Sequence, residues 1–375
     1  MRIAVVAERR PGEFRVAAVP DTVALLVRAG HHVVVAAGAG TGAWIDDGEY
    51  EQVGAQVVDG DVIGAAEVVL HVRPLLPDEA SRLTRGTVTI GFMTPAAEPD
   101  GVRALRDVGA TSFSMELVPR ISRAQSMDAL TSQALVAGYR CTLEAAMRLP
   151  RFFPLFMTAA GTVPPAKVLV LGAGVAGLQA IATAKRLGAV VEAYDVRPAS
   201  ADEVRSMGAT FVELGLEAVE GTGGYARELG EERARRQAEL LAPYVAKADV
   251  LITTAAIPGR AAPRLVSADM VAAMRPGSVV VDLAADSGGN VEGSVAGQEV
   301  LNAGVRIVGM ADTASTMPVD ASRLYAKNLT NLLALMVDAD GGLALNLDDE
   351  VLAGACVTHD GVVRHEPTRQ LLEEN

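Results

Sequence analysis

The stretch Lys167-Val168-Leu169-Val170-Leu171-Gly172-Ala173-Gly174-Val175-Ala176-Gly177-Leu178 decides the fold of this chain. Its apolar first half predicts a buried strand, and residues 175–187 have the apolar spacing of a helix. The pattern G-x-G-x-x-G means little alone, but it is informative between a strand and a helix. Gly172 would make the tight turn, Gly174 would let the backbone approach a pyrophosphate, and Gly177 would let the helix pack on the strand.

Free backbone N–H groups at the start of this helix would face the phosphates of a dinucleotide, so Ala173 and Val175 join the glycines as candidates. The next predicted strand ends in Asp195-Val196-Arg197, where Asp195 is placed to accept hydrogen bonds from the adenosine ribose. A carboxylate here repels a 2′-phosphate, although an arginine such as Arg197 can accommodate one. The sequence therefore predicts an NAD(H) site and favours NAD over NADP.

Strand-like and helical patterns alternate along the whole chain. In the first half, strand-like runs occupy residues 3–7, 32–37, 68–72, 88–92 and 111–117. A second series occupies residues 168–171, 190–195, 210–213, 250–254, 278–282 and 305–308. Parallel strands need crossover connections, which the helical patterns supply. We therefore expect an α/β protein with two Rossmann-like, doubly wound parallel-sheet domains and a cleft between them.

A long helical pattern at residues 321–337 carries an apolar stripe that must be buried against another element. The first domain is the expected partner, which would make that domain discontinuous. We expect an N-terminal Rossmann-like domain of residues 1–130 with 320–375, and an NAD(H)-binding domain of residues 131–319. The members of the stripe are Leu324, Leu329, Leu332, Leu333 and Met336.

The composition excludes several classes of function. Lys and Arg number 33 against 46 Asp and Glu, giving a net charge of −13 and no basic footprint for nucleic acid. Cys141 and Cys356 lie far apart with no Cys or His at ligand spacing, so we expect buried thiols and no metal site. The longest uncharged run, residues 168–184, is too short and too rich in glycine for a membrane helix.

Histidine is scarce where a dehydrogenase would need it. The chain has five, and none lies between His71 and His359, the interval that holds the glycine motif. His71 ends a predicted strand and could reach a cleft, whereas His359 and His365 have the pattern of loop residues. Reduction of a keto acid needs a general acid or base, most often His or Lys. Direct hydride transfer between two nicotinamides needs positioning instead, and the sequence favours that chemistry.

Residues 119–133 form a polar loop between the two halves, with two arginines, amides and hydroxyls and few apolar anchors. We expect it at the interdomain cleft, where ligands bind in two-domain α/β enzymes. Its composition also fits a purely structural role, in which Asp128 or Ser126 caps the helix that continues to Arg140.

This loop, with Gly138-Tyr139-Arg140 after it, resembles the signature loop of the NAD(H)-binding component, domain I, of proton-translocating NAD(P) transhydrogenase. The loop is the most specific element of the resemblance. The remaining elements are shared with alanine dehydrogenase, a relative of the same fold. They comprise the glycine turn and residues 13–17, 223–226, 253–259, 281–284, 288–290 and 326–329.

The resemblance implies a role for individual residues. Arg120, Gln125 and Asp128 would hold the nicotinamide carboxamide and ribose of NADH, with Gln125 reaching toward the nucleotide of the partner. Tyr225 would lie on a mobile loop that closes over NADH and excludes water. Thr131 stands where the family more often has serine, and it keeps the hydroxyl. The further candidate cofactor contacts are Ser122, Thr131, Gly224, Tyr225, Thr254, Ala255 and Ala256.

The resemblance also implies partners. Hydride would pass from NADH to NADP⁺ on a separate NADP(H)-binding subunit, coupled to proton translocation by membrane-spanning subunits, as in the Si-specific/Re-specific transhydrogenases. A chain that ends at Asn375 resembles the split-subunit form, a peripheral protein on the cytoplasmic side of the cell membrane. The family component is a homodimer, and we expect the apolar stripe of residues 321–337 or other exposed apolar surface to serve as its interface.

Alanine dehydrogenase is the alternative. It uses an arginine on the substrate carboxylate, a lysine on the carbonyl and a histidine for proton transfer. Arg15 keeps the first position, but Arg73 replaces the lysine and Thr94 the histidine, and neither side chain is a base near neutral pH. Asp286 keeps a carboxylate near the nicotinamide, so this alternative stays open. A third possibility is an NAD-binding regulator without chemistry, against which the Arg120, Gln125 and Asp128 set argues.

Overall fold

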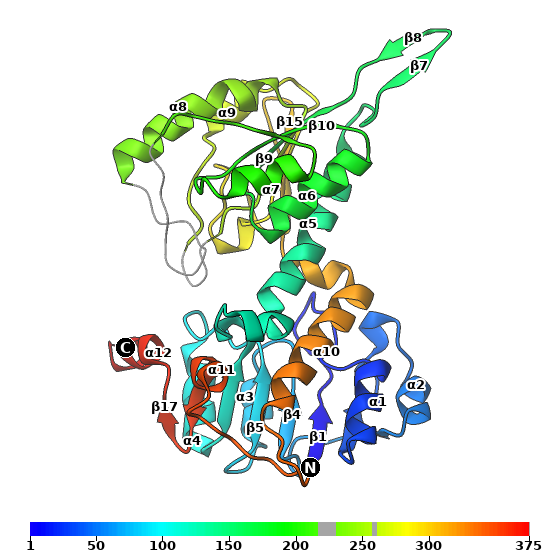
Figure 1. The fold of residues 1–375 in the computed structure, drawn as a ribbon, viewed down its shortest axis with the longest axis vertical. Coiled ribbons are helices and arrows are strands. Elements are labelled where there is room, and N and C mark those ends of the chain that lie inside the picture. The colour runs from blue at the N-terminus through cyan, green and yellow to red at the C-terminus, as the bar shows by residue number, and fades with distance from the viewer. Residues whose placement is uncertain (217–229, 257–260, 375) are drawn as a thin grey trace. The chain divides into compact units, whose positions relative to one another are not determined.

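The computed structural model describes residues 1–216, 230–256 and 261–374, which form two compact units (Figure 1). Unit 1 comprises Met1–Gln133 and Ser315–Asn375, and unit 2 comprises Ala134–Ala314. Each unit is an α/β domain with its own mostly parallel sheet. The predicted fold class of two Rossmann-like sheets is confirmed.

Unit 1 contains an eight-stranded sheet of order β17-β16-β6-β5-β4-β1-β2-β3. Its six parallel strands, joined by crossovers, are β1 (Arg2–Val5), β2 (His32–Ala36), β3 (Gln56–Val58), β4 (Val68–Leu70), β5 (Val88–Gly91) and β6 (Thr111–Ser114). The antiparallel additions at one edge are β16 (Cys356–His359) and β17 (Val362–Val363). His359 therefore belongs to a strand, and its predicted position in a loop is wrong, because residues from both ends of the unit pair at this edge.

The helices of unit 1 cover both faces of this sheet. They are α1 (Pro20–Arg28), α2 (Asp47–Gln52), α3 (Pro77–Ala80), α4 (Pro99–Val108), α10 (Pro318–Ala334), α11 (Glu350–Ala355) and α12 (Glu366–Glu374). The orange helix α10 lies among the blue and cyan elements of the N-terminal segment (Figure 1).

The apolar stripe of α10 belongs to the core of unit 1. Leu329, Leu332, Leu333 and Met336 are buried against strand residues such as Ile3. Full burial of one such side chain is worth about 1.5–3 kcal/mol, which explains why the helix returns to this unit. The core already covers these four residues, so the expectation that they form a dimer interface is wrong, whereas Leu324, the fifth member of the stripe, is 37% exposed.

Unit 2 contains a seven-stranded sheet of order β11-β10-β9-β12-β13-β15-β14. Its parallel strands are β9 (Lys167–Leu171), β10 (Val190–Tyr194), β11 (Thr210–Phe211), β12 (Val250–Thr253), β13 (Val279–Asp282) and β15 (Val305–Gly309), and β14 (Glu299–Asn302) is antiparallel. The chain moves outward from β9 to β11 and then restarts at β12, so the strand order reverses between β9 and β12. Such a reversal is where open α/β sheets bind their ligands.

Strand β9 is buried on both faces, which explains its continuous apolar sequence. Val168 and Val170 enter one apolar layer, whereas Leu169 and Leu171 enter the other. The helices of unit 2 are α6 (Val175–Arg186), α7 (Ser200–Ser206), α8 (Glu231–Lys247) and α9 (Ala268–Ala272), and the long α5 (Ala129–Arg148) leads into this unit.

Two features of the strands in unit 2 have no counterpart in the sequence-based prediction, the edge strand β14 and a hairpin. Strands β7 (Phe156–Thr158) and β8 (Gly161–Val163) form an antiparallel hairpin that projects from the unit (Figure 1). Its strands pair with each other and with no other described strand.

Three further observations concern the described residues. Cys141 and Cys356 are buried free thiols, as predicted. Within the described ranges no helix combines the length and apolar character needed to cross a membrane. Nor do three His, Cys, Asp or Glu side chains of the described chain gather as a metal site.

Candidate functional site

The turn after β9 requires glycine at two positions. Gly172 has a φ of +97°, and a Cβ built on it would lie 2.8 Å from Oγ1 of Thr254. A Cβ on Gly177 would lie 1.9 Å from the carbonyl oxygen of Gly172. The Thr254 hydroxyl donates a hydrogen bond to that same carbonyl at 3.0 Å. Gly172 and Gly177 are thus needed for the fold, and Thr254 fastens the turn to the end of β12.

Gly174 is different, because its surroundings are open. It is the N-cap residue of α6, and a Cβ built on it would meet no described atom within 4 Å. Glycine has no side chain that could accept a hydrogen bond from the first-turn N–H groups, so these groups carry no side-chain cap. An uncapped helix start with room above it is suited to a phosphate.

Asp195 follows β10 and is bonded to this turn. Its carboxylate is nearly buried, and Oδ2 accepts a hydrogen bond of 2.7 Å from the amide of Ala173. Oδ1 accepts one of 2.8 Å from the amide of Arg197. The Arg197 guanidinium completes the set with Nε 3.0 Å from Oδ1 and Nη2 3.1 Å from Oδ2, and this pairing raises the pKa of Arg197.

A cavity of about 240 Å³ adjoins Asp195, and we call it the adenosine slot. Its walls are largely apolar and also include the carboxylates of Asp195 and Glu213 and the guanidinium of Arg233, a combination that fits a planar base and its ribose. The hydroxyl of Tyr194 donates to Gln237 at 3.2 Å, and burial raises the pKa of Tyr194 to about 12. The apolar lining consists of Tyr194, Val196, Pro198, Phe211, Val212, Leu214 and Leu216.

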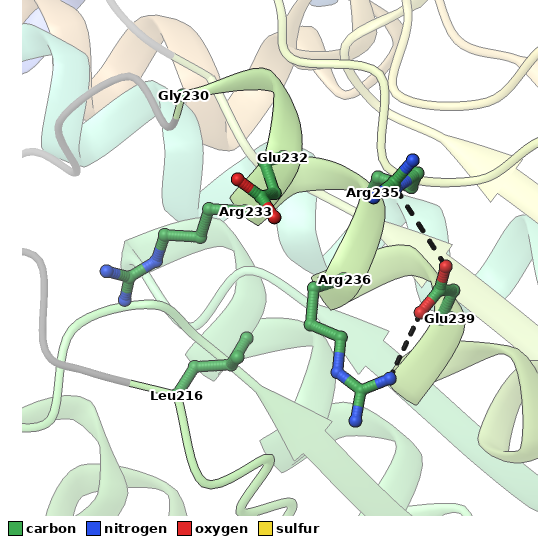
Figure 2. Close-up of a pocket in the computed structure, with 7 residues that line it drawn as sticks. All are labelled: Leu216, Gly230, Glu232, Arg233, Arg235, Arg236 and Glu239. Carbon is green, nitrogen blue, oxygen red and sulfur yellow. Dashed lines mark hydrogen bonds and ion pairs between the residues drawn. The ribbon is translucent and has the colours of Figure 1, made fainter.

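Arg233 of α8 lines both the adenosine slot and a second, more open pocket. Figure 2 shows that Arg235 and Arg236 both turn to Glu239, at 4.0 and 3.1 Å, whereas Arg233 points away from them. The second pocket adjoins Leu216 and Gly230, which flank residues 217–229. The predicted contacts Gly224 and Tyr225 lie outside the described residues, and we assign no ligand to this pocket.

The loops after β12 and β13 are held together by Asn290. Its Oδ1 accepts from the amide of Ala255 at 3.1 Å, and its Nδ2 donates to the carbonyls of Ala255 and Pro263, both at 2.8 Å. Ala256 is exposed beside them. Asn290 is a residue to which the sequence alone assigns no role, although it lies in the segment 288–290 that carries the family resemblance. The structure brings together these predicted contacts of unit 2: Gly172, Ala173, Gly177, Asp195, Arg197, Thr254 and Ala255.

The polar loop belongs to unit 1, where it forms a 3-10 helix at Ser122–Met127. Buried Ala124 and Met127 anchor it to the core, and the carbonyl of Ser126 accepts hydrogen bonds of 2.9 Å from Asn328 and Asn331. The backbone of the loop is therefore held in place by two side chains of α10.

Asp128 caps helix α5, as the structural interpretation of the loop predicts. Its carboxylate accepts hydrogen bonds from the amide and the hydroxyl of Thr131 at 2.8 and 2.6 Å. Arg120, Ser122 and Gln125 are exposed on the same loop. The geometry thus gives Asp128 and Thr131 a structural task. Contact of all five with NADH stays a prediction.

Arg15 and Arg73 stand at the positions where alanine dehydrogenase binds its substrate, and in this chain both are bonded to other side chains of unit 1. Glu13 has a fully buried carboxylate that accepts hydrogen bonds from Arg15 (Nε and Nη2, both 2.7 Å) and from Arg73 (3.0 Å). The remaining nitrogen of Arg15 donates to Gln133 at 2.8 Å. Because its own protein uses all three nitrogens, Arg15 would have to break these bonds to grip a substrate carboxylate. Thr94 has a φ of +42°, in the left-handed region.

His71 is buried, with Nδ1 2.7 Å from the carbonyl of Arg73 and Nε2 without a partner among the described residues. Its ring lies on Gly91, where a Cβ would be 2.3 Å from Nδ1. A side chain this buried is poorly placed to exchange protons with a ligand. Burial lowers its pKa to about 4.

Glu8 and His71 are expected to give the protein opposing pH dependences. Burial raises the pKa of Glu8 to about 7, so its contribution to stability is lost as pH rises from 4.5 to 7. His71 has the opposite effect on stability. Below pH 6.5 its ring is protonated in the unfolded chain but stays neutral in the folded one, so stability falls as pH falls. Between pH 6.5 and 4 this should cost about 3 kcal/mol of unfolding free energy.

Urea unfolding of His71→Asn at a series of pH values checks this expectation, since asparagine keeps the donor to the Arg73 carbonyl and cannot titrate. The stability advantage of the wild type over this variant should shrink as pH falls from 6.5 to 4. Glu8→Gln should change the slope in the opposite direction. Parallel curves for the wild type and His71→Asn would contradict the assignment.

Comparison with known proteins decides the family. Residues 4–137 match the family described as "Alanine dehydrogenase/PNT, N-terminal domain", and residues 141–366 match "Alanine dehydrogenase/PNT, C-terminal domain". The chain belongs to the alanine dehydrogenase/PNT family. The predicted family is thereby confirmed.

The chain is similar to proteins named as NAD(P) transhydrogenase and to proteins named as alanine dehydrogenase. A Rhodospirillum rubrum protein named as one portion of NAD(P) transhydrogenase subunit alpha is 48% identical over 376 residues, covering 97% of this chain and 98% of that protein. A transhydrogenase structure from Sinorhizobium meliloti is 48% identical with a TM-score of 0.88, covering 97% of this chain and all of that one. Alanine dehydrogenase of Mycobacterium tuberculosis is 36% identical over 300 residues, covering 78% of this chain and 75% of that protein. These relatives support an NAD-binding oxidoreductase and a component of NAD(P) transhydrogenase.

Proposed function

We propose that this chain is the NAD(H)-binding component of a proton-translocating NAD(P) transhydrogenase and passes hydride from NADH to NADP⁺ on a partner subunit. The observation that carries the proposal is the 48% identity to a transhydrogenase subunit over nearly the whole of both chains. The internal bonds of Arg15 and the absence of a base at Arg73 and Thr94 support it against the alanine dehydrogenase alternative.

The residues of unit 2 fit a dinucleotide. The open, uncapped start of α6 would hold the phosphates at Gly172–Gly177, and the adenosine slot with Asp195 would hold the base and ribose. Bound NADH supplies the hydride. Arg120, Gln125 and Asp128 would orient the nicotinamide, and no described side chain has to move a proton.

The partners follow from this role. We propose an NADP(H)-binding subunit and membrane-spanning subunits that couple transfer to proton translocation, and a peripheral place on the cytoplasmic side of the cell membrane. The relatives are named as the alpha subunit of NAD(P) transhydrogenase, which supports the existence of partner subunits.

Two assays test the proposed function. Mixed with an NADP(H)-binding transhydrogenase component, the purified chain should let NADH reduce an NADP analogue. Incubated alone with NADH, pyruvate and ammonium, it should oxidise no NADH. Pyruvate-dependent oxidation would establish the dehydrogenase instead, and failure of both assays would favour a regulator that binds NAD without chemistry.

We propose a homodimer in which the β7–β8 hairpin meets a second copy. Phe156 and Met157 are exposed by 42% and 76% of their surfaces, and the adjoining Phe152 and Leu155 are exposed as well. A two-stranded hairpin is marginally stable alone, and a grouped apolar surface of this kind marks an interaction site.

Replacing Phe156 and Met157 together by serine should convert the dimer into a monomer in sedimentation analysis, because both apolar anchors are lost. The melting temperature should change by no more than about 3 °C, since the hairpin contributes little to the core of unit 2. Met207→Ser, at an exposed apolar residue elsewhere on unit 2, is the control and should stay dimeric. A double variant that remains a dimer would remove the hairpin from the interface.

A further inference from the structure

The carboxylate of Asp195 has no acceptor position left for a ribose. A carboxylate offers about four lone-pair sites. Here Oδ1 accepts from the amide and from Nε of Arg197, and Oδ2 accepts from the amide of Ala173 and from Nη2 of Arg197. A ribose diol donates two O–H groups to such a carboxylate, so two of the four present donors have to leave before it can bind.

The four donors differ in how easily they can leave. The amide of Ala173 belongs to the glycine turn, and the amide of Arg197 is fixed by the backbone that follows β10. The guanidinium is held by a side chain that is one quarter exposed. Only this group can turn into solvent without rearranging the backbone. It also provides two of the four hydrogen bonds, which is the number that the diol brings.

A guanidinium at this point would itself bind a different ligand. Arginine presents paired N–H donors that match phosphate oxygens, and it stays charged at every physiological pH. In this chain the charge of Asp195 cancels that of Arg197 at hydrogen-bond distance. The same carboxylate repels a 2′-phosphate, so it opposes NADP both directly and by occupying the arginine.

We propose that Asp195 and Arg197 form an exchangeable pair that determines coenzyme choice: the ribose diol of NAD(H) displaces the guanidinium, and Asp195 keeps Arg197 from serving as a 2′-phosphate site. The proposal rests on the dinucleotide site of the proposed function and gives that site its basis for selectivity. Two residues of one loop thus have different roles: Asp195 binds the ribose, and the Arg197 guanidinium competes with the ribose for that carboxylate.

Two adenosine nucleotides that differ only in the group at issue provide the test. Binding of 5′-AMP and of adenosine 2′,5′-bisphosphate to the full chain is measured by calorimetry. The wild type should prefer 5′-AMP. Asp195→Asn should shift the ratio of the two affinities at least tenfold toward the bisphosphate, because the repelling charge is gone and Arg197 is released. Adding Arg197→Met to Asp195→Asn should abolish that shift.

Arg197→Met alone tests the displacement, and it leaves the Asp195 carboxylate in place. The variant should bind 5′-AMP at least as tightly as the wild type, because the competitor of the ribose diol is absent. A loss of more than threefold would show that the guanidinium is itself a ligand of the nucleotide, and would overturn the exchange. The control pair is Asp100→Asn and Arg103→Met, whose ion pair of 2.6 Å on α4 of unit 1 should leave both affinities unchanged.

The remaining outcomes are distinguishable. Equal binding of the bisphosphate by Asp195→Asn and by the double variant would assign the phosphate to another cation, such as Arg233 of the adenosine slot, and would overturn the proposal. So would the absence of any shift in Asp195→Asn while the wild type binds 5′-AMP, and the proposed function would then stand. A wild type that binds neither nucleotide would overturn both.

Discussion

Gly174→Ala is expected to lower the affinity for NADH by about 100-fold, or about 2.7 kcal/mol, while the protein stays folded. The added methyl group meets no described atom within 4 Å, and the backbone of Gly174 has ordinary dihedral angles for an N-cap residue. Among the described residues it obstructs nothing, so its expected effect is on a ligand that approaches the start of α6. Separating the phosphates from these amides removes charge-assisted hydrogen bonds worth about 1.5–3 kcal/mol each.

The measurement combines calorimetric titration of NADH with thermal unfolding. Replacing glycine by alanine at an N-cap costs no more than about 1 kcal/mol, so the melting temperature should fall by no more than about 4 °C. Gly101→Ala, an equally open glycine in α4 of unit 1, is the control and should leave the affinity for NADH unchanged. Gly177→Ala should unfold the turn itself, because its Cβ would lie 1.9 Å from the Gly172 carbonyl. Unchanged NADH binding by Gly174→Ala would place the phosphates elsewhere.

Most parallel strands of the two sheets could be predicted because each is a short apolar run, and burial on both faces leaves such runs few alternatives. Strands β3, β14, β16 and β17 at the sheet edges were not predicted. The ends of the predicted strands were less predictable. The run 111–117 predicts one strand, but pairing with β5 ends at Ser114 and the next three residues turn into a 3-10 helix, Met115–Leu117. The end of a strand depends on where its neighbour stops, and a single run does not contain that information.

The hairpin β7–β8 could not be predicted for a different reason. Phe156 and Met157 have large apolar side chains of the kind found in a core, but they are exposed in the single chain. Apolar character alone does not say whether a residue is covered by its own chain or by another. The same ambiguity, in the opposite direction, led to the wrong expectation that the four buried residues of the α10 stripe form an interface.

The candidate site could be predicted where its chemistry is local in the sequence. Gly172, Gly174 and Gly177 lie within one turn, and Asp195 follows the next strand, so their proximity follows from one βαβ unit. Asn290 and Glu13 depend on contacts between distant segments. Asn290 joins two loops that follow different strands, and Glu13 pairs with Arg73 some sixty residues away. Only the folded chain shows that these polar groups are used internally.

Gln125→Asn is expected to slow hydride transfer from NADH to NADP⁺ by about 100-fold and to leave the affinity for NADH within a factor of three. The side chain of Gln125 is exposed, and it forms no hydrogen bond with a described residue, so its shortening should not disturb the fold. The backbone beneath it is rigid, because Ala124 and Met127 are buried and the Ser126 carbonyl is held by two asparagines of α10. A shorter amide on a rigid turn cannot recover its reach by moving the loop.

This loss should fall on transfer rather than on binding because the reacting carbons have to approach to about 3–3.5 Å, and an error of about 1 Å costs about 100-fold. Single-turnover transfer to an NADP analogue on the partner component gives the rate, and titration of NADH on the isolated chain gives the affinity. Gln52→Asn, the same substitution at an exposed position at the end of α2, is the control for the chemical change. Equal losses of rate and affinity would make Gln125 a binding residue only, whereas an unchanged rate would move the site of transfer away from the polar loop.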